Sequence, residues 1–310
     1  MTTQKKIVLL DTSYYRSRAK DLDKIYPADQ YIRCLDASSL LELSDIYESD
    51  GSLKADAHVR ESSYQQYEAR NLRIILNTGQ IMIYEHENIK LPSFPFISRE
   101  EEKDLKIHIA GKGRNYKQIE AQRKKALEEE QMAVNDLWNN VITISNQNCS
   151  ISLEDIEKKK EQIYLTQSFL PFISQTQQRK RQSIAQLIFD SGFKTLHPAL
   201  SNLNVDCMKD REKFYLPGMQ YLKSNCPAIN AHFTFYSLLF LLTRRHEDKQ
   251  ITPTIAGTQI KIDKNSLTDI KIGLGALPYV NLFETLDKHQ ANLLRILLPE
   301  HTGKIVNNFK

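Results

Sequence analysis

Residues 7–13 read IVLLDTS, and this short stretch decides the fold. Four consecutive apolar residues that end at a polar turn are typical of a short buried β-strand. Asp11 follows the strand directly, so its carboxylate stands at the strand's C-terminal end. In open parallel sheets, this is the end at which sites form. The pattern therefore predicts a parallel sheet with Asp11 in a functional site.

A second acidic residue follows the next predicted strand. Residues 31–35 are expected to form that strand, and the stretch 38–43, which reads SSLLEL, comes soon after it. We therefore expect Glu42 to lie in a helix over the same sheet edge. Its assignment is the least constrained of the candidate acids, and the alternatives for the same role are Glu48, Glu68 and Asp206.

The stretch 269–287, DIKIGLGALPYVNLFETLD, places two more carboxylates at element boundaries. Asp269 begins an apolar helical stretch, and Asp287 follows a predicted strand at 279–283. We expect this strand to lie beside the strand at 7–10 in a mostly parallel sheet. Only then do the chain's two distant parts contribute carboxylates to one site.

Several carboxylates gathered at one site favour a divalent cation. Mg²⁺ prefers oxygen ligands and takes one or two carboxylates directly. Such an ion promotes in-line displacement at a phosphate without a covalent intermediate. Without a cation, the carboxylates repel one another and their pKa values rise. The candidate catalytic residues and metal ligands are Asp11, Glu42, Asp269 and Asp287.

The stretches 7–13, 38–43 and 269–287 together resemble the PIN-domain ribonucleases, in a divergent form. In that family a first strand ends in Asp-Thr-Asn/Ser, and a helix supplies a Glu. A later helix starts with Asp, and a strand then leads to Thr-x-Asp or Thr-x-Asn. The order and residue types agree with this sequence.

The resemblance implies a three-layer α/β/α sandwich with a mostly parallel central sheet. It also implies that the four carboxylates bind Mg²⁺ or Mn²⁺ and that the chain hydrolyses RNA phosphodiester bonds, with DNA left open as a substrate. Ser13 and Thr285 are the expected substrate-binding residues beside the metal. Family members that are toxic to their host need a cognate inhibitor, so such a partner is expected on resemblance alone.

The long separation between Glu42 and Asp269 requires a large insertion. Residues 98–195 are rich in helix-forming charged residues, with opposite charges at i,i+4 spacing. We therefore expect a helical insertion at 98–195 and a discontinuous core at 1–97 and 196–310. A helix start is expected at residues 152–155, which read SLED.

A basic cluster in this region is the predicted contact for the RNA backbone. Arg179, Lys180 and Arg181 have no acidic neighbour within four positions, so they are candidates to bind phosphate. A solvated helix face is the alternative. The basic residues from Lys112 to Lys125 alternate with acidic ones, which favours a solvated face for that group.

Composition sets the outer limits. The chain has 310 residues, of which 41% are hydrophobic, and a formal net charge of +4, which is compatible with a nucleic-acid partner. Its four cysteines lack the paired spacing of a zinc site. The apolar stretch at 233–242 is too short to cross a bilayer, and no secretion signal is visible, so we expect a cytoplasmic protein without a membrane segment.

Two alternatives to the nuclease remain open. One is a PIN-like fold that has lost catalysis and serves as an RNA-binding or protein-interaction module in a larger assembly. The other is an unrelated α/β protein with a helical partner-binding domain. Clustering of the carboxylates within reach of one or two ions would favour the enzyme.

Overall fold

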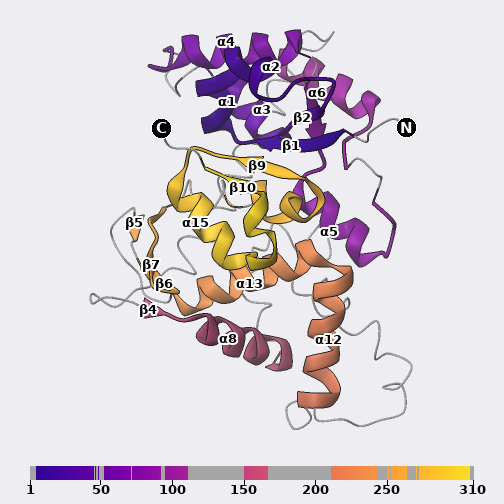
Figure 1. Cartoon of the computed structure of the whole chain (residues 1–310), viewed down its shortest axis with the longest axis vertical. Helices are drawn as coiled ribbons and strands as arrows, with labels where there is room; N and C mark the ends of the chain where they lie inside the picture. Colours follow the sequence, from indigo (N-terminus) through magenta and orange to yellow (C-terminus); the bar gives the residue numbers. More distant parts are fainter. Residues whose placement is uncertain are drawn as a thin grey trace.

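A computed structural model describes residues 5–44, 46, 48, 52–70, 72–91, 95–110, 150–166, 211–242, 250, 251, 253–263, 270 and 272–307. Within these residues, the centre of the molecule is a five-stranded sheet with the order β10-β9-β1-β2-β3 (Figure 1). All neighbouring strands in it are parallel. The strands are β1 (Lys6–Leu10), β2 (Tyr31–Asp36), β3 (Arg73–Ile75), β9 (Leu282–Glu284) and β10 (Ile305–Val306).

The first strand lies in the middle of this sheet. Leu9 pairs with Cys34 of β2 on one side and with Phe283 of β9 on the other. All three side chains are fully buried, as expected for a parallel strand covered on both faces. The predicted adjacency of the strands near the two ends of the chain is therefore confirmed.

Helices cover both faces of the sheet and make a three-layer α/β/α sandwich (Figure 1). One layer comes from the N-terminal part of the chain. It contains α1 (Thr12–Arg18), η1 (Ala19–Asp21), α2 (Leu22–Ile25), α3 (Ala37–Ser44), α4 (Ala57–Ala69) and α6 (Arg99–Ala110).

The opposite layer contains α15 (Lys288–Leu297), α5 (Thr78–His86) and α13 (Pro227–Leu241), together with helical residues 272–276. The flanking 3₁₀ turns are η3 (Leu277–Tyr279) and η4 (Pro299–Lys304). Beyond α13 lie α8 (Leu153–Thr166) and α12 (Arg211–Asn225), which both contact it. Each helix in the described residues is too short or too polar to span a bilayer.

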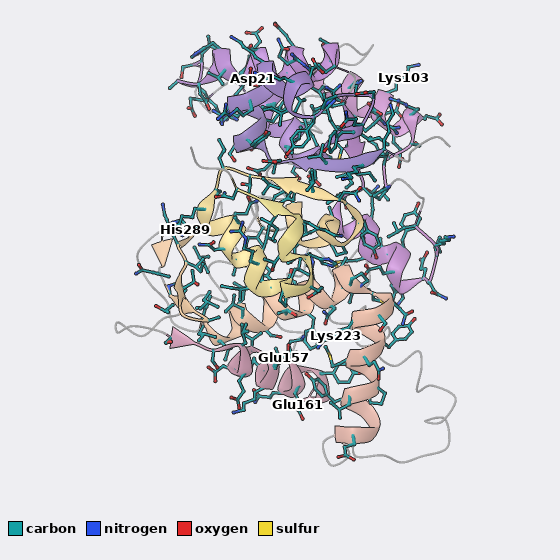
Figure 2. All side chains as sticks on the ribbon, viewed as in Figure 1. Asp21, Lys103, Glu157, Glu161, Lys223 and His289 are labelled. Atoms are coloured by element: carbon teal, nitrogen blue, oxygen red, sulfur yellow. The ribbon has the colours of Figure 1, made fainter. Side chains whose placement is uncertain are left out.

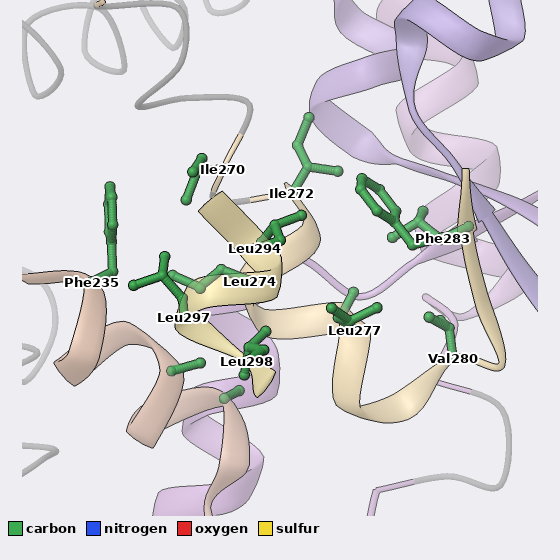
Figure 3. Close-up of a cluster of buried hydrophobic side chains, with 14 of the residues drawn as sticks. Phe235, Ile270, Ile272, Leu274, Leu277, Val280, Phe283, Leu294, Leu297 and Leu298 are labelled. Atoms are coloured by element: carbon green, nitrogen blue, oxygen red, sulfur yellow. The ribbon is translucent and has the colours of Figure 1, made fainter. Parts of the chain in front are cut away.

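The core of the C-terminal layer lies between α15, α13 and the sheet. Figure 3 shows Phe235 of α13 facing Leu297 of α15, while Leu294 and Phe283 lie nearer the sheet. Gly275 lets residues 272–276 approach α5, because a Cβ atom there would lie 2.4 Å from Cγ2 of Thr78. Apolar burial of this kind stabilises by roughly 25 cal/mol per Å².

The predicted strand at 279–283 needed correction. The strand begins at Leu282, and the preceding residues Leu277–Tyr279 form the turn η3. Pro278 lacks a backbone N–H and has a fixed φ, so it favours the turn over a ladder position. The strands predicted at 7–10 and 31–35 are confirmed as β1 and β2.

The described parts of the expected insertion at 98–195 pack against the sandwich. Helix α6 lies in the N-terminal layer, where Tyr67 donates a hydrogen bond of 3.4 Å to Glu102. Helix α8 begins at Leu153 as expected, with a reciprocal cap between Ser152 and Asp155. The stretch before it forms a strand, β4 (Ser150–Ile151), which pairs with β6 (Thr254–Ile255).

The short strands complete the described structure. Strand β6 also pairs with β7 (Thr258–Gln259), and β5 (Gln250–Ile251) pairs with β8 (Ile262–Asp263), both in the antiparallel sense. β5, β6 and β7 lie to the left of α15 (Figure 1), and the N–H of Lys261, just before β8, donates to His289 near the start of α15. Cys34 and Cys226 are both buried, as expected for cysteines that act as small core residues.

Candidate functional site

The candidate site lies at the carboxyl edge of β1 and β9. The chain passes from β1 to β2 and β3 in one direction, and β9 and β10 lie on the other side of β1. The order of strands therefore reverses between β1 and β9, and such switch points are where open α/β sheets bind ligands. The backbone ladder continues past the strands, because Asp11 N–H donates to the carbonyl of Glu284 at 2.8 Å.

Asp11 is held at this edge by several hydrogen bonds. Its side chain caps α1 and accepts hydrogen bonds from the backbone N–H (3.1 Å) and the hydroxyl of Ser13. The hydroxyl of Thr285 lies 3.2 Å from the same oxygen, Oδ2. Each hydrogen bond to Asp11 from the described residues goes to Oδ2, so Oδ1 has none from them.

Burial raises the pKa of Asp11, because the charged form loses its hydration. The hydrogen bonds from Ser13 oppose this rise, and the negative charge of Glu42 adds to it. Glu42 is therefore close enough to Asp11 for their charges to interact. A cation would relieve both the burial cost and the repulsion, which makes the pair suited to a positively charged ligand.

Thr285 joins the two halves of the site. Its hydroxyl accepts from the N–H of Asp287 at 3.0 Å and lies 2.6 Å from Oε1 of Gln290. The single hydroxyl proton is donated either to Gln290 or to Asp11. Ser13 adds a second bridge, since its hydroxyl accepts from the N–H of Leu286 at 3.2 Å. Ser13 and Thr285, the expected substrate-binding residues, both lie within hydrogen-bond distance of Asp11, and their substrate-binding role stays a prediction.

Asp287 follows β9 and caps α15. Its Oδ1 accepts from the N–H groups of His289 (2.7 Å) and Gln290 (3.0 Å). This is the usual role of aspartate at a helix start. In the described part of the chain, Oδ2 has no hydrogen-bond partner. His289, labelled in Figure 2, is the second residue of α15, and its Nδ1 accepts from the N–H of Lys261 at 3.1 Å.

Glu42 lies on α3, as expected, but its carboxylate faces two arginines. Its Oε1 is 3.6 Å from Nη1 of Arg16 and 3.9 Å from Nη1 of Arg60, and the side chain is 41% exposed. These are ion pairs without hydrogen bonds. Partly exposed pairs of this type contribute little stability, so Glu42 is held loosely.

Asp36 is a carboxylate that sequence reasoning overlooked. It is the last residue of β2, is 3% exposed, and accepts from the N–H of Ser38 at 2.7 Å. The register of β1 and β2, continued by two more pairs, sets Asp36 beside Asp11. The sequence contained the pattern that could have identified it, because Asp36 follows the predicted strand 31–35 just as Asp11 follows residues 7–10.

Four predicted site residues fall outside the described residues. Asp269 precedes the helical stretch, and Arg179, Lys180 and Arg181 lie in the unassigned stretch 167–210. Their placement in the site therefore stays a prediction. The alternative acid Asp206 also lies there.

The described residues meet the needs of a divalent ion in part. Asp11 and Asp287 each keep one carboxylate oxygen without a hydrogen bond from these residues, and Glu42 is loosely held. However, no group of three His, Cys, Asp or Glu side chains among them is arranged to hold a metal ion. A full ligand set would need Asp269 or a movement of Glu42.

Comparison with known proteins identifies no relative: no family model, no curated protein and no solved structure matches the chain.

Proposed function

We propose that this protein is a metal-dependent ribonuclease whose site lies at the carboxyl edge of β1 and β9. One observation carries the proposal. Asp11 and Thr285, which are far apart in the sequence, lie within hydrogen-bond distance at the switch point of the sheet. A buried acid at that location, whose pKa is raised by burial and further by the charge of a second acid, is suited to bind a cation.

The acidic residues of the site would bind the metal ion, and the hydroxyl residues would orient Asp11. Asp11 and Asp287 would hold the ion through the oxygens that are not used for capping, with Glu42 and Asp269 completing the set. When bound, Mg²⁺ or Mn²⁺ supplies positive charge for the developing charge on the phosphate. Ser13 and Thr285 fix the orientation of Asp11, so its free oxygen is held ready.

Helix α15 favours an anionic substrate at the same edge. Its N-terminus lies at Asp287, and the partial positive charge of a helix N-terminus attracts anions. Its capping aspartate uses only one oxygen for the first turn. A phosphate near this edge therefore meets both a helix start and the acids that would bind its counter-ion.

A second function has support in the same geometry. Asp287 caps α15 and the Glu42 carboxylate faces two arginines, so each acid has contacts within the protein that need no metal ion. A PIN-like module that binds RNA without cutting it would need nothing more. Binding without cleavage in the test below would select this function.

The test is incubation of the full chain with a labelled single-stranded RNA in Mn²⁺ or Mg²⁺, with EDTA as the blank. We expect metal-dependent cleavage that Asp11→Asn lowers by at least about a hundredfold, the scale of losing one electrostatic group at a catalytic site. Asp155→Asn, on the exposed start of α8, is the matched control and should cut like the wild type. Equal cleavage by Asp11→Asn and wild type would refute the proposal.

A further inference from the structure

Two arginines lie beside the acidic edge and share the same partners. Arg16 is on α1, one turn beyond Ser13, and Arg60 is on α4. Arg16 pairs with Asp56, and Nε of Arg60 donates to Oδ1 of Asp56 at 2.8 Å. Both guanidinium groups also face Glu42, which closes a ring of alternating charge.

The members of this ring are held unequally. Asp56 is hydrogen-bonded to both arginines, and the bond from Arg60 helps to keep its pKa below the usual range. The Glu42 carboxylate approaches the same groups only to 3.6 and 3.9 Å and is the most exposed member, although Nη1 of Arg60 also donates to the backbone carbonyl of Glu42 at 2.7 Å. Asp56 therefore positions the arginines, and the Glu42 carboxylate is the anion that another anion can replace.

We infer that Arg16 and Arg60 form a phosphate-binding pair, which receives the backbone of single-stranded RNA in place of the Glu42 carboxylate. Guanidinium groups offer five N–H donors in a planar fork that matches phosphate oxygens. The pair lies next to the acid whose charge acts on Asp11, so a phosphate bound there is adjacent to the proposed reaction edge. This inference deepens the proposed function and rests on it for the choice of RNA.

The same helix carries a matched control. Near its other end, Asp23 bridges Arg33 and Arg70, and Nε of Arg70 lies 2.8 Å from Oδ2 of Asp23. Arg60 and Arg70 are ten residues apart, or about 15 Å along a helix. Arg60→Gln and Arg70→Gln thus remove similar Asp-bridged arginines at different distances from the edge.

The experiment measures binding of a fluorescent oligouridylate to the full chain in EDTA over a range of KCl concentrations. Arg16→Gln and Arg60→Gln should each weaken binding about tenfold, because each removes a charge-assisted hydrogen bond. Each should also flatten the plot of log affinity against log salt by about 0.7 per lost phosphate contact. Arg70→Gln should bind like the wild type. Unchanged binding by the first two variants, or an equal loss in Arg70→Gln, would overturn the inference.

Glu42→Gln should change RNA affinity in the opposite direction, and it leaves both guanidinium groups in place. It removes the competing carboxylate, so RNA should bind more tightly than to the wild type in EDTA. A ring with only a structural role predicts no such gain, and weaker binding by Glu42→Gln would refute the exchange. If the arginine variants behave as expected but Mn²⁺ and Mg²⁺ give no cleavage, the nuclease proposal fails and the phosphate site stands. If Mn²⁺ or Mg²⁺ gives cleavage but the arginine variants bind RNA like the wild type, the nuclease proposal stands and the phosphate site fails.

Discussion

Asp11 and Glu85 are both buried carboxyl groups whose pKa is raised by burial, yet their surroundings differ. Glu85 uses both oxygens: Oε1 accepts from the N–H of Ala228 and Oε2 from that of Ile229, each at 2.8 Å. Tyr279 donates a further hydrogen bond to Oε1. Asp11 instead receives its hydrogen bonds from the described residues on one oxygen.

The difference distinguishes a structural carboxyl group, Glu85, from a candidate functional one, Asp11. Glu85 ties the end of α5 to the first turn of α13 and to η3, and its hydrogen-bonding capacity serves the fold. Asp11 stands at the switch point of the sheet with another acid nearby and an oxygen to spare. A raised pKa therefore does not by itself identify a functional carboxylate. The arrangement of hydrogen-bond donors around the carboxyl group is what distinguishes Asp11 from Glu85.

The largest effect on stability should come from removing the Glu85 carboxyl group. Glu85→Ala leaves two N–H groups of α13 without an acceptor and removes side-chain volume. We expect the free energy of unfolding to fall by about 3–4 kcal/mol. Urea denaturation followed by circular dichroism measures this change. Exposed Glu87→Ala, from the same end of α5, is the control, and equal midpoints for the two variants would contradict the assigned role.

The pH dependence of stability should carry the signature of Glu85. Burial raises its pKa to about 7 from the model-compound value of 4.5. The folded state therefore binds more protons than the unfolded state between these values, and stability falls as pH rises through this window. The loss is at most about 3 kcal/mol and is complete above pH 7. Asp11, whose pKa is also raised, acts in the same direction.

Glu85→Gln isolates that contribution. Its unfolding free energy, measured from pH 4 to pH 8, should vary less than that of the wild type, and the difference between the two curves should follow the titration of Glu85. Parallel curves would show that the group does not titrate in this range.

Two substitutions of Asp287 should have smaller effects on stability and should distinguish its role as a helix cap from the role of its charge. Asp287→Ala removes the cap of α15 and should lower stability by about 1 kcal/mol, while Asp287→Asn keeps the cap and should change it by less than about 0.5 kcal/mol. Under the proposed function, both variants lose RNA cleavage. Full cleavage by Asp287→Asn would limit Asp287 to its structural role. Thermal denaturation and the RNA assay together provide the comparison.

A small change in stability of the opposite sign is expected for Asp11→Asn. Asparagine also caps helices well, and the substitution removes a desolvated charge that Glu42 repels. The free energy of unfolding at pH 7 should therefore rise, by less than about 1 kcal/mol. A clear fall, measured in urea, would mean that Asp11 is held as firmly as Glu85.

The apolar strands and their terminal acids were predictable because they are local. Residues 7–10 and 31–35 are apolar or predominantly so, and the structure confirms strands there. The turn at Thr285 and the cap at Asp287 follow from short-range residue preferences. In contrast, the start of β9 was misplaced, because the effect of Pro278 outweighed the apolar character of the residues after it.

Contacts between distant segments could not be predicted in the same way. Glu85 reads as one charge on a helix, and only the packing of α5 against α13 shows that it is buried. The pairing of Glu42 with Arg16 and Arg60 depends on how three helices meet. Asp36 was visible in the sequence, but its significance depends on the register between β1 and β2.

The pairing of β1 with β9 also orders events during synthesis. Among the described strands β1 is made first, but its neighbour on one side, β9, is translated only after more than two hundred further residues. Such long-range pairing is slow to form and leaves the edge of β1 exposed in the growing chain. Asp11 and Thr285 meet only when this late strand docks, so a nascent chain has no assembled site. A ribosome translating this protein is therefore not exposed to the proposed activity until β9 has emerged and paired with β1.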